Sequence, residues 1–584
     1  MKNVKYQFAA MMTAGMMLFA TSCDDSFLEV PPVGQLGESQ LSTLAGIDAV
    51  LISVYSQVNG RFQRLASPSN WVWGSIRGGD ANKGTDPGDF ATINPIQRFE
   101  TDPTVAILEE NWNGNFEGIA RANQVLRLLD VKGPDVSDAV ATGIEAQARF
   151  LKAHFYFQLW RNFNKVPIIP KEADYKKGLE EIKNDQEMLP YIEAEMRFAA
   201  DNLPATQPQV GRVNSWAAKA YLGKIILYKA NQTGSASDYQ AAKTLFDDVI
   251  ANGVTSNGLK YGLVPFYDNM FRGANDNHQE SIWAYQSAAN TGSVNNANPE
   301  FDLNFPYNTG PNGPGNCCGF FQPSFSFVNS FRTSNGLPLL DGSFNAPANR
   351  VVSDMGLTSA QDFTPDAGPL DPRVDHTTGR RGIPYLDWQD FPGQAWIRNQ
   401  PNGGPYSPKK YVYSRAEQGS FQDNSSWTPG YTGINFLIIR FADVLLMSAE
   451  VEVELGNLEA ARALVNQVRT RAKNSPILRA NGTPAANYVV NTYDAAWTDA
   501  NTARAAVRFE RKLELGMEGH RFYDLVRWKT DKAELDAYFA LEGALLPAAM
   551  GGGAAYDIKH RVLPLPQNQI DLVGSDILIQ NPGF

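Results

Sequence analysis

The 584-residue chain has few of the residue types on which enzymes and disulfide-rich proteins depend. It holds only 3 cysteines, and two of them, Cys317 and Cys318, are adjacent, so a hydrophobic core rather than a disulfide framework must hold the fold together. Its 5 histidines lie far apart without metal-ligand spacing, which argues against a zinc site. The motifs HExxH, GxSxG and GxxxxGK are missing, so the sequence shows no common metalloprotease, hydrolase or phosphate-binding signature.

Positive charge is also scarce. The 51 Lys and Arg residues are outnumbered by 62 Asp and Glu residues, which gives a formal net charge of -11. A basic surface for nucleic acid or anionic lipid is therefore not expected, and we predict no nucleic-acid partner. Beyond the N-terminus, no hydrophobic run approaches the roughly 18 residues that a membrane-spanning helix needs.

The N-terminus has the pattern of an export signal. Lys2 and Lys5 precede a short apolar run over residues 8–20, and small residues lie directly before Cys23. The run is too short to span a bilayer, so we predict that residues 1–22 form a cleaved lipoprotein signal peptide. Cys23 is then the predicted lipidation site and membrane anchor, with plain secretion as the alternative.

Helical patterning occupies both ends of the chain. Apolar residues recur with the period of amphipathic helices in segments 41–57, 112–163, 187–203, 216–230, 239–251, 437–455, 458–473 and 499–530. Several of these segments form pairs of about 30 residues joined by tight turns, which is typical of tetratricopeptide-like repeats. The repeats are degenerate and interrupted.

Between residues 253 and 430 the helical period disappears. Gly, Pro, Asn and aromatic residues dominate there, and the segment is too rich in aromatic side chains to be a solvated linker. Long ordered loops are often functional. We therefore predict an N-terminal helical region (23–252), a loop-rich aromatic ligand-binding subdomain (253–430) and a C-terminal helical region (431–584).

Short blocks along the chain resemble the motifs of one protein family and occur in that family's order. They are Arg149–Pro167, Arg440–Glu450, Asn466–Ala472, Glu510–Trp528, Leu563–Pro566 and Gln580–Phe584. Each block alone is weakly specific, but together they are similar to the SusD/RagB family of outer-membrane nutrient-binding lipoproteins. The resemblance implies a mostly α-helical, tetratricopeptide-like scaffold that carries a large loop-rich subdomain.

The same resemblance implies a function. The protein is expected to be anchored on the outer face of the outer membrane, to bind a glycan and to deliver it to a SusC-like TonB-dependent transporter. Peptide cargo, as in the RagB branch, is the alternative for the same uptake role. A glycoside hydrolase is a weaker alternative, since the family binds nutrients and does not cut them.

A hydrolase would need two carboxylates beside an open cleft. Glu510, Glu514 and Glu518 follow one another at helical spacing, and arginines lie close to them in the sequence at Arg511, Arg521 and Arg527. We therefore expect these glutamates to form ion pairs rather than an acid–base pair.

The resemblance implies ligand sites on loops, and sugar binding needs aromatic rings together with polar groups. The first candidate loop contains Asp80, Asn82 and Asp86. Their alternation is similar to a calcium loop, but the bidentate acid at its far end is missing. Ligand contact, a Ca²⁺ site and a plain hydrogen-bonded turn all remain open here; otherwise no cofactor is expected.

Two further loops are candidates. One holds Cys317, Cys318, Phe320 and Phe321, where a disulfide between adjacent cysteines would give a flat surface for a sugar. Two buried thiols are the alternative. The other loop region holds aromatic candidates, namely Trp388, Trp396, Trp427 and Tyr431. For these rings, a role as core anchors for the loops remains open beside ligand contact.

Overall fold

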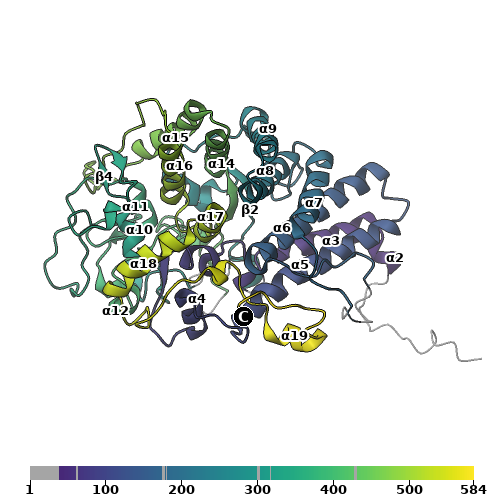
Figure 1. Cartoon of the computed structure of the whole chain (residues 1–584), viewed down its shortest axis with the longest axis horizontal. Coiled ribbons are helices and arrows are strands. Elements are labelled where there is room, and N and C mark those ends of the chain that lie inside the picture. Colours follow the sequence, from purple (N-terminus) through teal and green to yellow (C-terminus); the bar gives the residue numbers. More distant parts are fainter. Residues whose placement is uncertain are drawn as a thin grey trace, which may run out of the picture.

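The computed structural model describes most of the chain, namely residues 38–60, 64–173, 178, 181–298, 303–315, 317–425 and 431–584. The predicted signal peptide and Cys23 lie outside the described residues. Within the described ranges, no helix combines the length and the apolar character needed to cross a membrane. The fold is mostly helical, with the longer helices toward the two ends of the sequence (Figure 1).

The first half is mostly helical. Its helices are α2 (Glu38–Leu41), α3 (Leu44–Gln57), α4 (Asn94–Arg98), α5 (Ile107–Asp130), α6 (Asp138–Phe163), α7 (Met188–Asn202), α8 (Ser215–Thr233) and α9 (Ala236–Asn252). From α5 to α9, each helix packs against the next, and α9 packs against α14 of the second half. This stacking of helix pairs confirms the predicted tetratricopeptide-like scaffold.

Local sequence signals set the ends of these helices. The side chain of Ser137 caps α6 by accepting a hydrogen bond from the Val140 amide, and Asn214 caps α8 in the same way. Gly234 ends α8 with φ +70°, a left-handed conformation that glycine adopts without strain. Ser235 then caps α9, so the predicted tight turn is made by one C-cap followed at once by one N-cap.

The C-terminal half adds a second helical layer. Its helices are α14 (Phe441–Glu454), α15 (Leu458–Lys473), α16 (Ala500–Leu515), α17 (Arg521–Trp528), α18 (Asp531–Leu545) and α19 (Gln567–Val573), with a single turn η12 (Ile558–Arg561). Helix α14 packs against both α15 and α16.

One helix start was predicted wrongly. The apolar pattern placed a helix from Leu437, but α14 begins at Phe441, and Phe436–Arg440 forms strand β10. This strand pairs antiparallel with β2 (Ser281–Tyr285), and every residue of both strands is buried. A short apolar run that is buried on both faces has no period that separates a strand from a helix.

The middle of the chain consists of short elements on this scaffold. They are the helices α10 (Phe325–Asn329), α11 (Arg373–Thr377), α12 (Gln400–Gly403) and α13 (Gln418–Phe421), the strands β3 (Phe320–Pro323), β4 (Thr333–Ser334), β5 (Leu337–Pro338), β6 (Thr378–Gly379), β7 (Pro384–Tyr385), β8 (Gln389–Asp390) and β9 (Ser407–Pro408), and the single turns η5 (Tyr267–Phe271), η6 (Gly273–Asn275), η7 (Val294–Asn296), η9 (Gly310–Asn312), η10 (Ser343–Asn345) and η11 (Gln394–Trp396). Figure 1 shows β4, α10 and α12 at the end of the molecule opposite α2 and α3.

A segment from the first half joins this loop-rich part. It contains η2 (Arg64–Ala66), the π-helical turn η3 (Trp71–Ile76), strand β1 (Ala81–Gly84) and η4 (Ala91–Ile93). Strand β1 pairs antiparallel with β3, with Ala81 opposite Pro323 and Gly84 opposite Phe320. This pairing brings the loop after β1 next to the loop before β3.

Buried ion pairs lie within the C-terminal part and join it to the loop-rich middle of the chain. Arg440 contacts Glu280 (3.0 Å), Glu514 (2.5 Å) and Glu518 (2.8 Å). Glu510 is paired with arginines as well, at 2.7–2.8 Å, and these are Arg373 and Arg469. Ion pairing of the three glutamates is thus confirmed.

The pairing partners, however, are not the arginines that lie nearby in the sequence. Arg511 contacts Asp443 and Asp524, and Arg521 contacts Glu534. Arg527 pairs with Glu450 and Asp524. The partners of Glu510, Glu514 and Glu518 instead come from distant segments, because the fold brings these together only in three dimensions.

Candidate ligand-binding site

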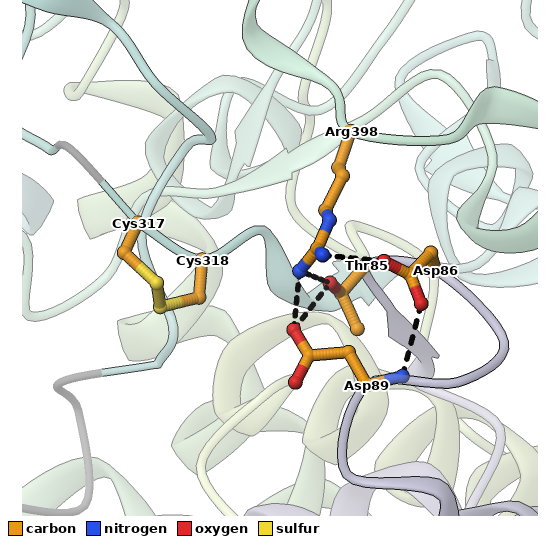
Figure 2. Close-up of a disulfide and its surroundings, with 6 residues drawn as sticks. All are labelled: Thr85, Asp86, Asp89, Cys317, Cys318 and Arg398. Carbon is orange, nitrogen blue, oxygen red and sulfur yellow. Dashed lines mark hydrogen bonds and ion pairs between the residues drawn. A yellow bond between two sulfur atoms is a disulfide. The ribbon is translucent and has the colours of Figure 1, made fainter.

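The β1–β3 pair brings together the loops of the candidate site. The amide of Thr85, directly after β1, donates a hydrogen bond to the Gly319 carbonyl oxygen (2.6 Å), directly before β3. Arg398, from the loop after η11, then reaches the same place. Its guanidinium contacts Asp86 (2.5 Å), donates to the Thr85 hydroxyl (3.0 Å) and forms an ion pair with Asp89 (Figure 2).

The loop that follows β1 is organised by a lysine. The Nζ of Lys83 donates to the backbone carbonyl oxygens of Asp86 (2.9 Å) and Asp89 (2.7 Å). Burial lowers the pKa of Lys83 to about 8, against the opposing effect of the two aspartates. The ammonium group thus occupies carbonyl oxygens of the kind that a bound Ca²⁺ would take.

Asp80, Asn82 and Asp86, whose spacing is similar to a calcium loop, contact three different partners. Asp80 accepts from the Met517 amide (3.0 Å), and Asn82 accepts from the Tyr538 hydroxyl (2.9 Å). Asp86 binds Arg398. In the part of the chain that the structure describes, no group of three or more His, Cys, Asp or Glu side chains is arranged to hold a metal ion.

Asp80 and Asn82 lie below the surface, where they fix β1. Both are completely buried, and burial raises the pKa of Asp80 to about 6. Asn82 also donates to Glu542 (3.3 Å), and burial raises the pKa of this carboxyl to about 7. These buried groups support the strand from beneath, while Asp86 is the member of the predicted trio that reaches the surface.

Cys317 and Cys318 are joined by the predicted disulfide. Cys318 is buried, whereas Cys317 is half-buried. Tyr307, a half-buried ring from a neighbouring loop, lies with its centroid 5.5 Å from the guanidinium carbon of Arg398. Gly319 has φ +78°, and a Cβ there would lie 3.2 Å from the Tyr307 Cβ, so glycine permits both the turn and this close approach.

The other aromatic candidates that the structure describes lie in the core of the loop-rich part. Phe320 and Phe321 are buried against Trp71, with ring centroids 6.2 and 5.7 Å away. Trp396 is buried between Tyr385 and Phe391.

Two more of these rings are also covered. Trp388 is buried, and its indole Nε1 donates to the Tyr413 carbonyl oxygen (3.2 Å). Tyr431 is buried, and Trp427 lies outside the described residues. The burial of the described rings favours their role as core anchors, and ligand contact by them stays a prediction.

Four partly exposed residues remain at the surface, and we call them the Arg398 patch: Asp86, Asp89, Tyr307 and Arg398. The side chains of Arg398, Asp86 and Asp89 are 31%, 30% and 34% exposed. A guanidinium and two carboxylates offer fixed donors and acceptors for hydroxyl groups, and a half-buried ring offers an apolar face. Sequence reasoning did not select Tyr307, Asp89 or Arg398 as site residues, because nothing local shows that their loops meet.

The fold and this patch define a class of protein, a helical-repeat scaffold whose loops carry an exposed patch of polar groups beside an aromatic ring. Residues 279–584, more than half of the chain, match the model of the SusD family, and residues 82–227 match a model described as starch-binding associating with outer membrane. The chain belongs to the SusD family.

Several known proteins are similar over most of the chain. A SusD-like protein of Bacteroides ovatus is 25% identical and covers 88% of this chain and 80% of its own. SusD-like protein P2 of Formosa agariphila is 24% identical over the full length of both chains. Among solved structures, a laminarin-binding SusD-like protein has a TM-score of 0.64 at 22% identity and covers 93% of this chain and 100% of its own. Surface glycan-binding protein A of Bacteroides thetaiotaomicron, in complex with laminarihexaose, has a TM-score of 0.62 at 19% identity and covers 92% and 99%.

Proposed function

We propose that this protein is a cell-surface lipoprotein that binds a glycan and delivers it to a SusC-like TonB-dependent outer-membrane transporter without cutting it. The Arg398 patch carries this proposal, since it combines exposed, pre-positioned polar groups with an aromatic ring. Two structural relatives are described as binding laminarin or laminarihexaose, which supports a glycan as the ligand.

The patch also favours a neutral glycan. Arg398 is already paired with two carboxylates, and Lys83 is bound to backbone oxygens. The two positive charges are therefore balanced by the carboxylates of Asp86 and Asp89, which would repel a sulfate or a sugar carboxylate placed beside them.

A binding panel tests the ligand. The purified full-length protein is titrated calorimetrically with neutral and anionic polysaccharides, oligosaccharides and peptides, and reducing ends are assayed after long incubation. We expect binding to a neutral glycan and no release of reducing ends. Peptide binding without glycan binding would favour the RagB-like alternative, and released reducing ends would favour a hydrolase.

Arg398→Ala tests the location of the site. We expect the affinity for the glycan to fall by about tenfold or more, because a charge-assisted hydrogen-bond donor is lost. Arg479→Ala is the matched control, since Arg479 forms a similarly exposed ion pair with Asp390 (3.0 Å). Equal affinity of the Arg398 variant and the wild type for the glycan would show that the glycan binds elsewhere on the protein.

The membrane anchor needs a separate test. A model described as associating with the outer membrane matches residues 82–227, which supports this location. Cys23→Ala is expected to release the protein from the membrane fraction, because a stable anchor there depends on the lipidated cysteine. Unchanged fractionation after detergent-free washing would contradict lipidation at Cys23.

A further inference from the structure

A cavity lies elsewhere on the scaffold, and none of its lining residues belongs to the Arg398 patch. Its volume is about 350 Å³, within the roughly 300–1,000 Å³ typical of small-molecule sites. Helix α3 forms one wall, the loop at residues 209–212 forms another, and the end of β2 with the loop that follows it completes the lining.

Aromatic rings from two elements line this cavity. Tyr55 comes from α3 and is half-buried, so it is the ring most open to the cavity. Trp283 and Tyr285 come from β2 and are 5% and 8% exposed, so each presents only a small part of its ring. Each tyrosine is held by its hydroxyl: that of Tyr55 donates to Gln147 (2.9 Å), and that of Tyr285 accepts from Asn59 (2.7 Å). The rings are therefore fixed in place before any ligand arrives, which reduces the entropic cost of binding.

Amide side chains provide the polar part of the lining, from Gln209, Gln286, Asn295 and Asn296. Gln286 is oriented by contacts with Asn277 (3.0 Å) and Asn435 (3.0 Å). Within the described part of the chain, the side-chain amide of Asn295 has no hydrogen-bond partner. It is half-buried and available to a ligand.

The cavity carries no uncompensated charge. Arg212 is the charged member among the lining residues that the structure describes, and it is paired with Asp48 (2.8 Å). Rings for apolar faces, amides for hydroxyl groups and a neutral lining are the chemistry that recognises a neutral saccharide. An anionic ligand would find no free cation here.

We propose that this cavity is a second binding site for a neutral saccharide, distinct from the Arg398 patch. The inference rests on the proposed glycan-binding function and extends it. With two sites on different parts of the scaffold, one long glycan can be held at two points, which raises the overall affinity through effective concentration.

Calorimetry on the full-length protein tests the second site, using short neutral oligosaccharides from the glycan class found in the panel. Ala288→Trp fills the cavity from an exposed lining position, and Asn295→Ala removes one amide without adding bulk. Ala139→Trp is the matched control, because Ala139 is an exposed residue of α6 that does not line the cavity.

We expect the Arg398→Ala variant to retain saccharide binding at this cavity, and Ala288→Trp to weaken that residual binding by about tenfold or more. Asn295→Ala should weaken it less, and Ala139→Trp should leave it unchanged. Two results would overturn the second site while leaving the proposed function intact. One is the loss of all saccharide binding in Arg398→Ala, and the other is a residual affinity that neither Ala288→Trp nor Asn295→Ala changes. Absence of saccharide binding by the wild type would overturn both.

Discussion

Two arginines of this protein have similar partners in opposite environments. Arg440 is 1% exposed and contacts three glutamates that are fully buried. Arg398 is 31% exposed and contacts two aspartates that are each about one-third exposed. The same side-chain chemistry therefore supports the scaffold in one region and leaves polar groups exposed at the surface in the other.

The difference follows from solvation. Around Arg440, each charge has left water and is stabilised only by its partners. Burial alone would raise the pKa of Glu514, but Arg471, Arg440 and Arg373 outweigh it and hold the pKa far below its usual range. Around Arg398, water screens the charges, so the ion pairs contribute little to stability and a ligand can compete for them.

The largest expected effect tests this contrast with one substitution at two positions. Arg440→Ala should lower the free energy of unfolding by about 3–5 kcal/mol, because three buried carboxylates lose a shared partner. Arg398→Ala should lower it by less than about 1 kcal/mol. Chemical denaturation of both variants measures the two free energies of unfolding. Equal losses of stability would show that burial does not determine how strongly each arginine stabilises the fold.

Buried acids below the site offer a second test, through pH. Burial raises the pKa of Glu542 from 4.5 to about 7. Between these values the folded protein keeps a proton that the unfolded chain has released, so stability falls as pH rises across this window. The loss amounts to about 3 kcal/mol at most, from 1.36 kcal/mol per pKa unit.

Glu542→Gln should therefore be more stable than the wild type at pH 8 and similar to it at pH 4.5. Denaturation midpoints at both pH values measure the difference. Glu100→Gln serves as an exposed control, since the Glu100 side chain is 50% exposed. If Glu542→Gln loses stability at pH 8, the carboxylate is charged there and its contact with Asn82 matters more than its desolvation.

The sequence predicted the scaffold better than the site. Helical periods extend over many residues, and the family motifs around Arg440 and Glu514 occur along the chain in the order that the family has. The error at Leu437–Arg440 arose where a buried strand has no period. The Arg398 patch depends on the pairing of β1 with β3, and no local pattern in either segment reveals that contact.

The smallest expected effect concerns Lys83, whose buried side chain holds a loop at the surface. Its side chain lies below the surface, yet it binds the carbonyl oxygens of the exposed loop that carries Asp86 and Asp89. Lys83→Met keeps most of the packing volume and removes the donor, so those oxygens lose their partner.

We expect the loop to loosen and the glycan affinity of Lys83→Met to fall by several-fold, to at most about tenfold, since Arg398 loses the fixed position of both aspartates. Lys219→Met is the matched control, because Lys219 pairs with Asp248 (2.6 Å) on α9 at a partly exposed position. Calorimetry compares the two variants, and added CaCl₂ supplies a further readout. If calcium restores binding to the Lys83 variant, the ammonium group replaces a metal ion in this loop; if affinity never falls, the loop is rigid without its lysine.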